Sequence, residues 1–189
     1  SHGMHPYGLG PQGMLFHPLY DLEPLYARLG SKLSTGMNEI DNMLGGGYIQ
    51  GACMMVDGES GTGKTTFACR MALAACDAKK KVLCIIYEES TDDLVRLMSS
   101  SGTNLKPAIE SGLLQTNAKV PEAADAELHL DQIVRQVDEL EPALVIVDPI
   151  SSCARMVGGA DTAGFFLLRL HNYCRVRGIS LLLTNQQPT

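Results

Sequence analysis

The stretch Gly58-Glu59-Ser60-Gly61-Thr62-Gly63-Lys64-Thr65 decides the fold class of this chain. It matches the pattern G-x-x-x-x-G-K-[ST] at every defined position. It follows a short apolar run, residues 52–56, and precedes residues 64–78, whose apolar side chains recur at helical spacing. Strand, loop and helix in this order predict a nucleoside triphosphate site. We expect ATP, although the loop itself does not separate ATP from GTP.

The residue types in this loop suit the binding of phosphate oxygens. Glycines let backbone N–H groups turn inward, and the N-terminus of the following helix adds partial positive charge. Lys64 supplies a mobile cation for the β- and γ-phosphates, which also makes it a catalytic candidate, and Thr65 offers a hydroxyl to Mg²⁺. We expect the nucleotide to be held by Gly58, Glu59, Ser60, Gly61, Thr62, Gly63, Lys64, Thr65 and Thr66.

Acidic residues follow two further apolar runs. Asp148 comes directly after residues 143–147, which places a carboxylate beside the loop, where it can orient Mg²⁺ through water. An aspartate here can also simply start a turn or cap a helix. Glu88 and Glu89 follow residues 82–87, and a carboxylate there can align the water that attacks the γ-phosphate. The alternative is a solvated corner, or acidic residues favouring the next helix's first turn.

Polar amides close the last apolar run, residues 179–183. Asn185 and Gln186 can hydrogen-bond the γ-phosphate or its attacking water, so we include both in the nucleotide site. The alternative is a polar strand end that turns into Pro188.

Apolar runs alternate with helical segments along the remaining chain. Residues 113–116 form a further short strand, and helices are predicted over 91–100, 125–140 and 161–177. Because crossover helices cover both faces of a parallel sheet, this alternation predicts a three-layer α/β fold with a mainly parallel sheet. Thr91 is the expected cap of the first helix, and the second turns Leu128, Ile133, Val134, Val137 and Leu140 inward.

The helix over 161–177 is apolar around most of its circumference, including Phe165, Phe166, Leu168 and Tyr173. Such a helix is covered twice, by its own sheet and by something else. The second cover is either the N-terminal leader or a neighbouring subunit.

The first 30 residues differ in composition from the rest. Ser1-His2-Gly3 before Met4 has the form of a cloning scar. Glycines and prolines interrupt residues 4–30, which we interpret as a leader or interdomain linker whose apolar side chains pack on another surface. The sequence therefore predicts two parts: residues 1–30, and an ATPase domain over 31–189.

Charge and composition restrict the partners. The formal charge of -6 and the pI of about 5.3 give no overall electrostatic reason to expect binding to nucleic acid.

Six cysteines without a C-x-x-C pair are interpreted as reduced core residues, which favours a cytoplasmic location. No apolar run approaches the ~20 residues of a membrane-spanning helix. The triplet Lys79-Lys80-Lys81 is expected to stay solvated at a helix C-terminus.

Several motifs together resemble the KaiC-type branch of the RecA-like P-loop ATPases. The resemblance covers residues 31–187 and is closer to the second of KaiC's two tandem domains. Its motifs are Leu33-Ser34-Thr35-Gly36, Ile40-Asp41, Leu44-Gly45-Gly46-Gly47, the phosphate loop, Tyr87-Glu88-Glu89-Ser90, Gly102 with Leu105, Pro121-Glu122, His129-Leu130 and Ile146-Val147-Asp148-Pro149-Ile150-Ser151-Ser152.

The resemblance implies a RecA-like ATPase that assembles into a ring, commonly a hexamer, with ATP between neighbouring subunits and a regulatory protein as a possible partner. It gives Glu88 the first role in hydrolysis and Glu89 a supporting one. Clock-type members also phosphorylate their own serines or threonines. The positions for that reaction, and for basic residues that reach a neighbour's ATP, have no match before Thr189, so the domain is expected to lack C-terminal strands.

Two other functions remain open. A RecA-type recombination or repair protein would bind single-stranded DNA in an ATP-dependent and salt-sensitive way. A binding-only module would hold the nucleotide without hydrolysing it, and replacing Glu88 and Glu89 would then leave phosphate release unchanged.

Overall fold

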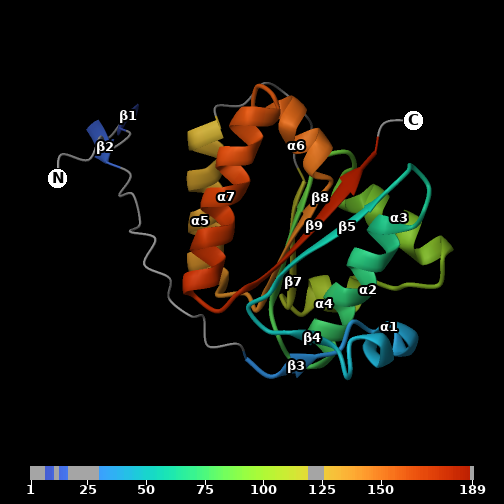
Figure 1. Ribbon diagram of the computed structural model, residues 1–189. Helices are drawn as coiled ribbons and strands as arrows, with labels where there is room; N and C mark the ends of the chain where they lie inside the picture. The colour runs from blue at the N-terminus through green and yellow to red at the C-terminus, as the bar shows by residue number, and fades with distance from the viewer. Residues whose placement is uncertain (1–6, 11–12, 17–29, 119–125, 188–189) are drawn as a thin grey trace.

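The computed structural model describes residues 7–10, 13–16, 30–118 and 126–187 (Figure 1). Its centre is a five-stranded sheet in the order β5-β9-β8-β6-β7, and every neighbouring pair is parallel. The strands are β5 (Cys53–Gly58), β6 (Val82–Ile86), β7 (Leu114–Ala118), β8 (Leu144–Asp148) and β9 (Ser180–Gln186). The four apolar runs and the short strand predicted over 113–116 are therefore strands of one sheet, and the predicted α/β class is confirmed.

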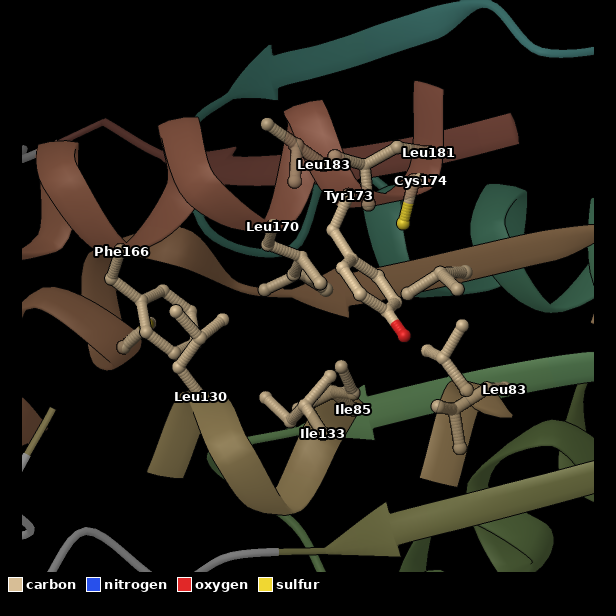
Figure 2. Packing of buried hydrophobic residues seen from close by; sticks show 14 of the residues in the cluster. Leu83, Ile85, Leu130, Ile133, Phe166, Leu170, Tyr173, Cys174, Leu181 and Leu183 are labelled. Atoms are coloured by element: carbon tan, nitrogen blue, oxygen red, sulfur yellow. The ribbon is translucent and has the colours of Figure 1, made fainter. Parts of the chain in front are cut away.

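Helices cover both faces of this sheet, as Figure 1 shows. One layer consists of α5 (Ala126–Leu140), α6 (Ile150–Met156) and α7 (Ala160–Val176); the other of α2 (Lys64–Asp77), α3 (Thr91–Ser100) and α4 (Lys106–Glu110). Strands β6 and β8 are buried along their whole length because they lie inside both layers. Figure 2 shows the first layer's core, where Phe166, Leu170 and Tyr173 of α7 pack between α5 and the sheet.

Two details of the predicted helices are wrong. The cap of α3 is Ser90, whose hydroxyl accepts a hydrogen bond from the Asp93 backbone N–H, whereas the Thr91 hydroxyl bonds Thr116 across to β7. Leu128 of α5 is 60% exposed, and His129 and Leu130 take its place on the buried face, beside the correctly predicted Ile133, Val137 and Leu140. Both errors arise because the direction of a helix face is set by its packing partners.

Several short elements have no strong sequence signal. The helix α1 (Asn38–Met43) and the antiparallel pair β3 (Lys32–Leu33) and β4 (Tyr48–Ile49) lie before the phosphate loop. In the predicted leader, β1 (Tyr7–Gly10) pairs with β2 (Gly13–Phe16) in a small hairpin. The packing predicted for residues 17–29 lies outside the described residues.

The predicted core cysteines are confirmed at five positions, whereas Cys53 is exposed because it lies on the edge strand β5. All six are free thiols. On α7, Phe165 is 71% exposed and Leu168 is 51% exposed, so the described residues leave this side of the helix open. Among the described residues, no helix combines the length and apolar character needed to cross a membrane.

Candidate nucleotide-binding site

The phosphate loop connects the end of β5 to the start of α2, as the sequence predicts. Gly61 and Gly63 have φ angles of 78° and 90°, a left-handed conformation that favours glycine, and Gly63 is the residue before the helix. The Lys64 ammonium donates to the carbonyl oxygens of Gly58 at 2.8 Å and Glu59 at 2.6 Å. The Lys64 side chain therefore folds back over the phosphate loop, and its ammonium lies beside the backbone carbonyls at the start of that loop.

A pocket of about 340 Å³ opens beside this loop and reaches the carboxyl ends of β6, β8 and β9. Among the predicted site residues, the pocket is lined by Ser60, Gly61, Gly63, Lys64, Thr65, Thr66, Glu88, Glu89, Asp148 and Gln186. Gly58, Glu59, Thr62 and Asn185 do not line it. Leu97, Met98 and Ser100 of α3, together with Ser101 directly after the helix, form a wall that the sequence did not indicate.

Asp148 is the buried acid of the site, with 7% of its surface exposed. It ends β8, directly beside Ile86 in the register of β6. One of its carboxylate oxygens accepts a hydrogen bond from the Thr184 hydroxyl on β9, and its backbone carbonyl accepts from the N–H of Tyr87 at 3.0 Å. These bonds fix the aspartate between both neighbouring strands.

The two glutamates after β6 have different surroundings. The Glu88 carboxylate accepts a hydrogen bond from Ser152 and forms an ion pair with Arg155 at 3.2 Å, both on α6. Glu89 carries a buried Oε2 atom without a hydrogen-bond partner among the described residues. Burial, and then the charges of Asp148, Glu88 and Asp93, raise the pKa of the Glu89 carboxyl above its usual value.

The amide side chains at the end of β9 have different partners. Gln186 lines the pocket, whereas the Asn185 side chain donates to the Asp57 carboxylate on β5 at 2.9 Å. Gln187 also donates to Asp57. Successive side chains of a strand point to opposite faces, which explains why neighbouring amides serve different partners. The structure does not bring Asn185 to the pocket.

The donor set of the pocket fits Mg²⁺, a hard cation that prefers oxygen ligands. Thr65 provides a hydroxyl, Asp148 a carboxylate, and Glu89 an unpartnered carboxylate oxygen. Mg²⁺ usually keeps several waters and takes one or two carboxylates together with phosphate oxygens. Among the described residues, no group of three or more His, Cys, Asp or Glu side chains is placed to hold a metal ion.

Three contacts of the site were missed from the sequence: Ser152 and Arg155 with Glu88, and Thr184 with Asp148. Ser152 and Arg155 stand three residues apart, a spacing that puts two side chains on one helix face. The two residues come soon after Asp148 in the chain. Their three-residue spacing was the feature of the sequence that could have indicated a shared contact. The partner of this face was not readable because Glu88 follows β6, more than sixty residues earlier in the chain.

Comparison with known proteins finds a matching family model and several related sequences. The family model for the KaiC ATPase matches residues 33–189. Over 186 residues the chain is 33% identical to the circadian clock protein KaiC2 of Synechocystis, covering 98% of this chain and 33% of the relative. Over 185 residues it is 29% identical to the circadian clock oscillator protein KaiC of Synechococcus elongatus, covering 97% and 35%. The chain thus spans about a third of these relatives' length.

Proposed function

The chain belongs to the KaiC family of ATPases, and on this premise we propose that it is a Mg²⁺-dependent ATP-hydrolysing domain of an oligomeric regulatory protein. The single observation that carries the proposal is the pocket. The phosphate loop, two adjacent glutamates and a buried aspartate come from three separate parts of the chain and line one cavity. Family membership alone implies nucleotide binding; this grouping of acids supports hydrolysis.

The roles of the loop residues follow from their chemistry. Backbone N–H groups of Ser60 to Gly63 and the N-terminus of α2 would hold the phosphates. Lys64, released from its contacts with Gly58 and Glu59, would place its ammonium on the β- and γ-phosphates. Thr65 and Asp148 would hold Mg²⁺, which supplies charge neutralisation on the phosphate oxygens when bound.

The acids after β6 would handle the attacking water. Glu88 would orient it and accept its proton, and Glu89 would support that role from its partly buried position. The raised pKa of Glu89 makes its carboxyl easier to protonate than an ordinary glutamate. Gln186, at the end of β9, would hydrogen-bond the γ-phosphate from the other side of the pocket. Asn185 would act indirectly, by holding Asp57 beside the loop.

Self-association is part of the proposal. Phe165 and Leu168 leave an apolar strip on α7 that another copy of the chain can cover. We propose that copies assemble into a ring and that the state of bound ATP controls the assembly or a partner protein. Mass in solution, measured with and without ATP and Mg²⁺, tests this point; a monomer under all conditions contradicts it.

Phosphate release tests the reaction itself. The chain should release phosphate from ATP only with Mg²⁺, and the variant with both Glu88→Gln and Glu89→Gln should lose about 100-fold or more in rate, as expected for loss of a general base. Binding of a fluorescent ATP analogue should remain in that variant. Unchanged phosphate release in the variant would overturn the catalytic assignment of the two glutamates. ATP binding by a parent chain that releases no phosphate would support a binding-only module, and ATP-dependent, salt-sensitive binding of single-stranded DNA would favour a RecA-type function.

A further inference from the structure

We propose that Ser152 and Arg155 of α6 are positioning residues for ATP hydrolysis, because they hold the carboxylate of Glu88 in the orientation in which it lines the nucleotide pocket. The inference rests on the proposed function, since it assigns the two residues to the same reaction. It concerns how Glu88 is oriented, which the family assignment does not address.

Three hydrogen bonds join these side chains in a triangle. The Ser152 hydroxyl donates to Glu88 Oε1, and Arg155 Nη2 donates to the same oxygen at 3.2 Å. Arg155 Nη2 also donates to the Ser152 hydroxyl oxygen. Ser152 therefore accepts from the arginine and donates to the glutamate, and each bond fixes the direction of the other two. Glu88 Oε2 receives none of these three bonds and remains the oxygen that can face a water.

The helix that carries both residues is firmly anchored. Ser152 has no exposed surface, and its neighbour Cys153 is also fully buried in the core between α7 and the sheet. Helix α6 begins two residues after Asp148, at Ile150. Asp148 and the two residues that bond Glu88 thus belong to one continuous segment of chain, residues 148–155.

The exposure of the ion pair argues against a role in stability. The Arg155 side chain is 63% exposed and that of Glu88 42% exposed. Exposed ion pairs of this kind contribute little to the stability of the fold. The ion pair can still determine how the Glu88 carboxylate is oriented, because the side-chain torsions of an exposed glutamate are free unless neighbouring residues restrain them. A misplacement of about 1 Å at a reacting group can cost about 100-fold in rate.

Steady-state phosphate release by the whole chain tests the proposal. Arg155→Ala should lower kcat by about 10- to 100-fold, as expected for a misoriented catalytic group, while KM for ATP changes by less than about twofold. Arg155→Lys should recover part of kcat, since an ammonium can still donate to Glu88 but lacks the planar fork. Ser152→Ala should also lower kcat. Arg169→Ala is the matched control, because Arg169 forms a comparable ion pair with Glu127 between α7 and α5.

A double-mutant cycle separates positioning from an independent role. In single-turnover measurements with radiolabelled ATP, Arg155→Ala should have no further effect on rate once Glu88 is replaced by Gln. Melting temperatures of all variants should lie within a few degrees of the parent chain. A wild-type kcat in Arg155→Ala, or an equal loss of rate in both Glu88 backgrounds, overturns the inference while leaving hydrolysis intact. A parent chain that releases no phosphate overturns the proposed function and, with it, this inference.

Discussion

The hydroxyl of Thr184 donates a hydrogen bond to the carboxylate of Asp148, and both side chains are buried between neighbouring strands of the sheet. Thr184 is fully buried, so this bond is shielded from water. A buried carboxylate needs such a partner, since an unpaired charge in the interior is costly. The bond leaves the remaining acceptor capacity of Asp148 for the pocket.

Replacing Asp148 tests its role with Mg²⁺. Asp148→Asn keeps an oxygen that can accept from Thr184 but removes the negative charge. We expect the Mg²⁺ concentration for half-maximal phosphate release to rise about 10- to 100-fold, the usual effect of losing a residue that orients a metal's ligands. Asp161→Asn, at the exposed start of α7, is the control. An unchanged Mg²⁺ titration in Asp148→Asn would show that the aspartate does not serve the metal.

Lys64 is the cation of the phosphate loop, and its loss should weaken nucleotide binding. Lys64→Ala removes charge-assisted hydrogen bonds of about 1.5–3 kcal/mol each, so Kd for ATP should rise at least about tenfold. Titration calorimetry with ATP and Mg²⁺ measures this change. Lys106→Ala, at the exposed first position of α4, should bind like the parent chain. Equal affinity in both variants would rule out a phosphate contact for Lys64.

Glu89 should make stability depend on pH in a defined direction. Because burial and neighbouring acids raise the pKa of Glu89 in the folded state, folding favours its neutral form. That contribution is present at acidic pH and is lost as the pH rises through the raised pKa. Glu89→Gln should therefore increase the melting temperature by about 1–3 °C at pH 7.5 and by less near pH 4.

Calorimetric melts of parent and variant at both pH values measure this difference. Glu110→Gln, in the short helix α4, is a suitable control because Glu110 is exposed to solvent. A variant that is less stable than the parent at pH 7.5 would contradict the stated environment of Glu89.

Two adjacent phenylalanines of α7 should respond very differently to substitution. Phe166 is 2% exposed and packs in the core shown in Figure 2, so Phe166→Ala should cost about 3–5 kcal/mol in the free energy of unfolding. Phe165 is 71% exposed, and Phe165→Ala should cost no more than about 0.5 kcal/mol in the isolated chain. Urea unfolding monitored by circular dichroism measures both values.

The same pair also bears on assembly. Phe165→Ala should reduce self-association at concentrations where the parent chain associates, because it removes solvent-exposed apolar surface from α7. Sedimentation at several concentrations would detect the change. Equal association of Phe165→Ala and the parent chain would place the contact between copies elsewhere on the molecule.

The sequence by itself determined the strands of the central sheet and the longer helices around it. The run from Gly58 to Thr65 requires a strand before it and a helix after it, and both are present as β5 and α2. The four apolar runs correspond to β5, β6, β8 and β9, and among these β6 and β8 are buried along their whole length, as expected for central strands covered on both faces. These signals are local in the chain, so they can be read without knowing what packs against what.

The tertiary structure alone decided how these elements meet. The order β5-β9-β8-β6-β7 puts Thr184 beside Asp148 and lets Ser152 and Arg155 reach Glu88. The same packing turned His129 inward in place of Leu128, and sent Asn185 to Asp57, away from the pocket. Each outcome depends on contacts between residues far apart in the chain. Hydrophobic patterning indicates which segments become strands and helices, whereas the residues that face inward and the hydrogen-bond partners they meet are fixed only when strands and helices pack together.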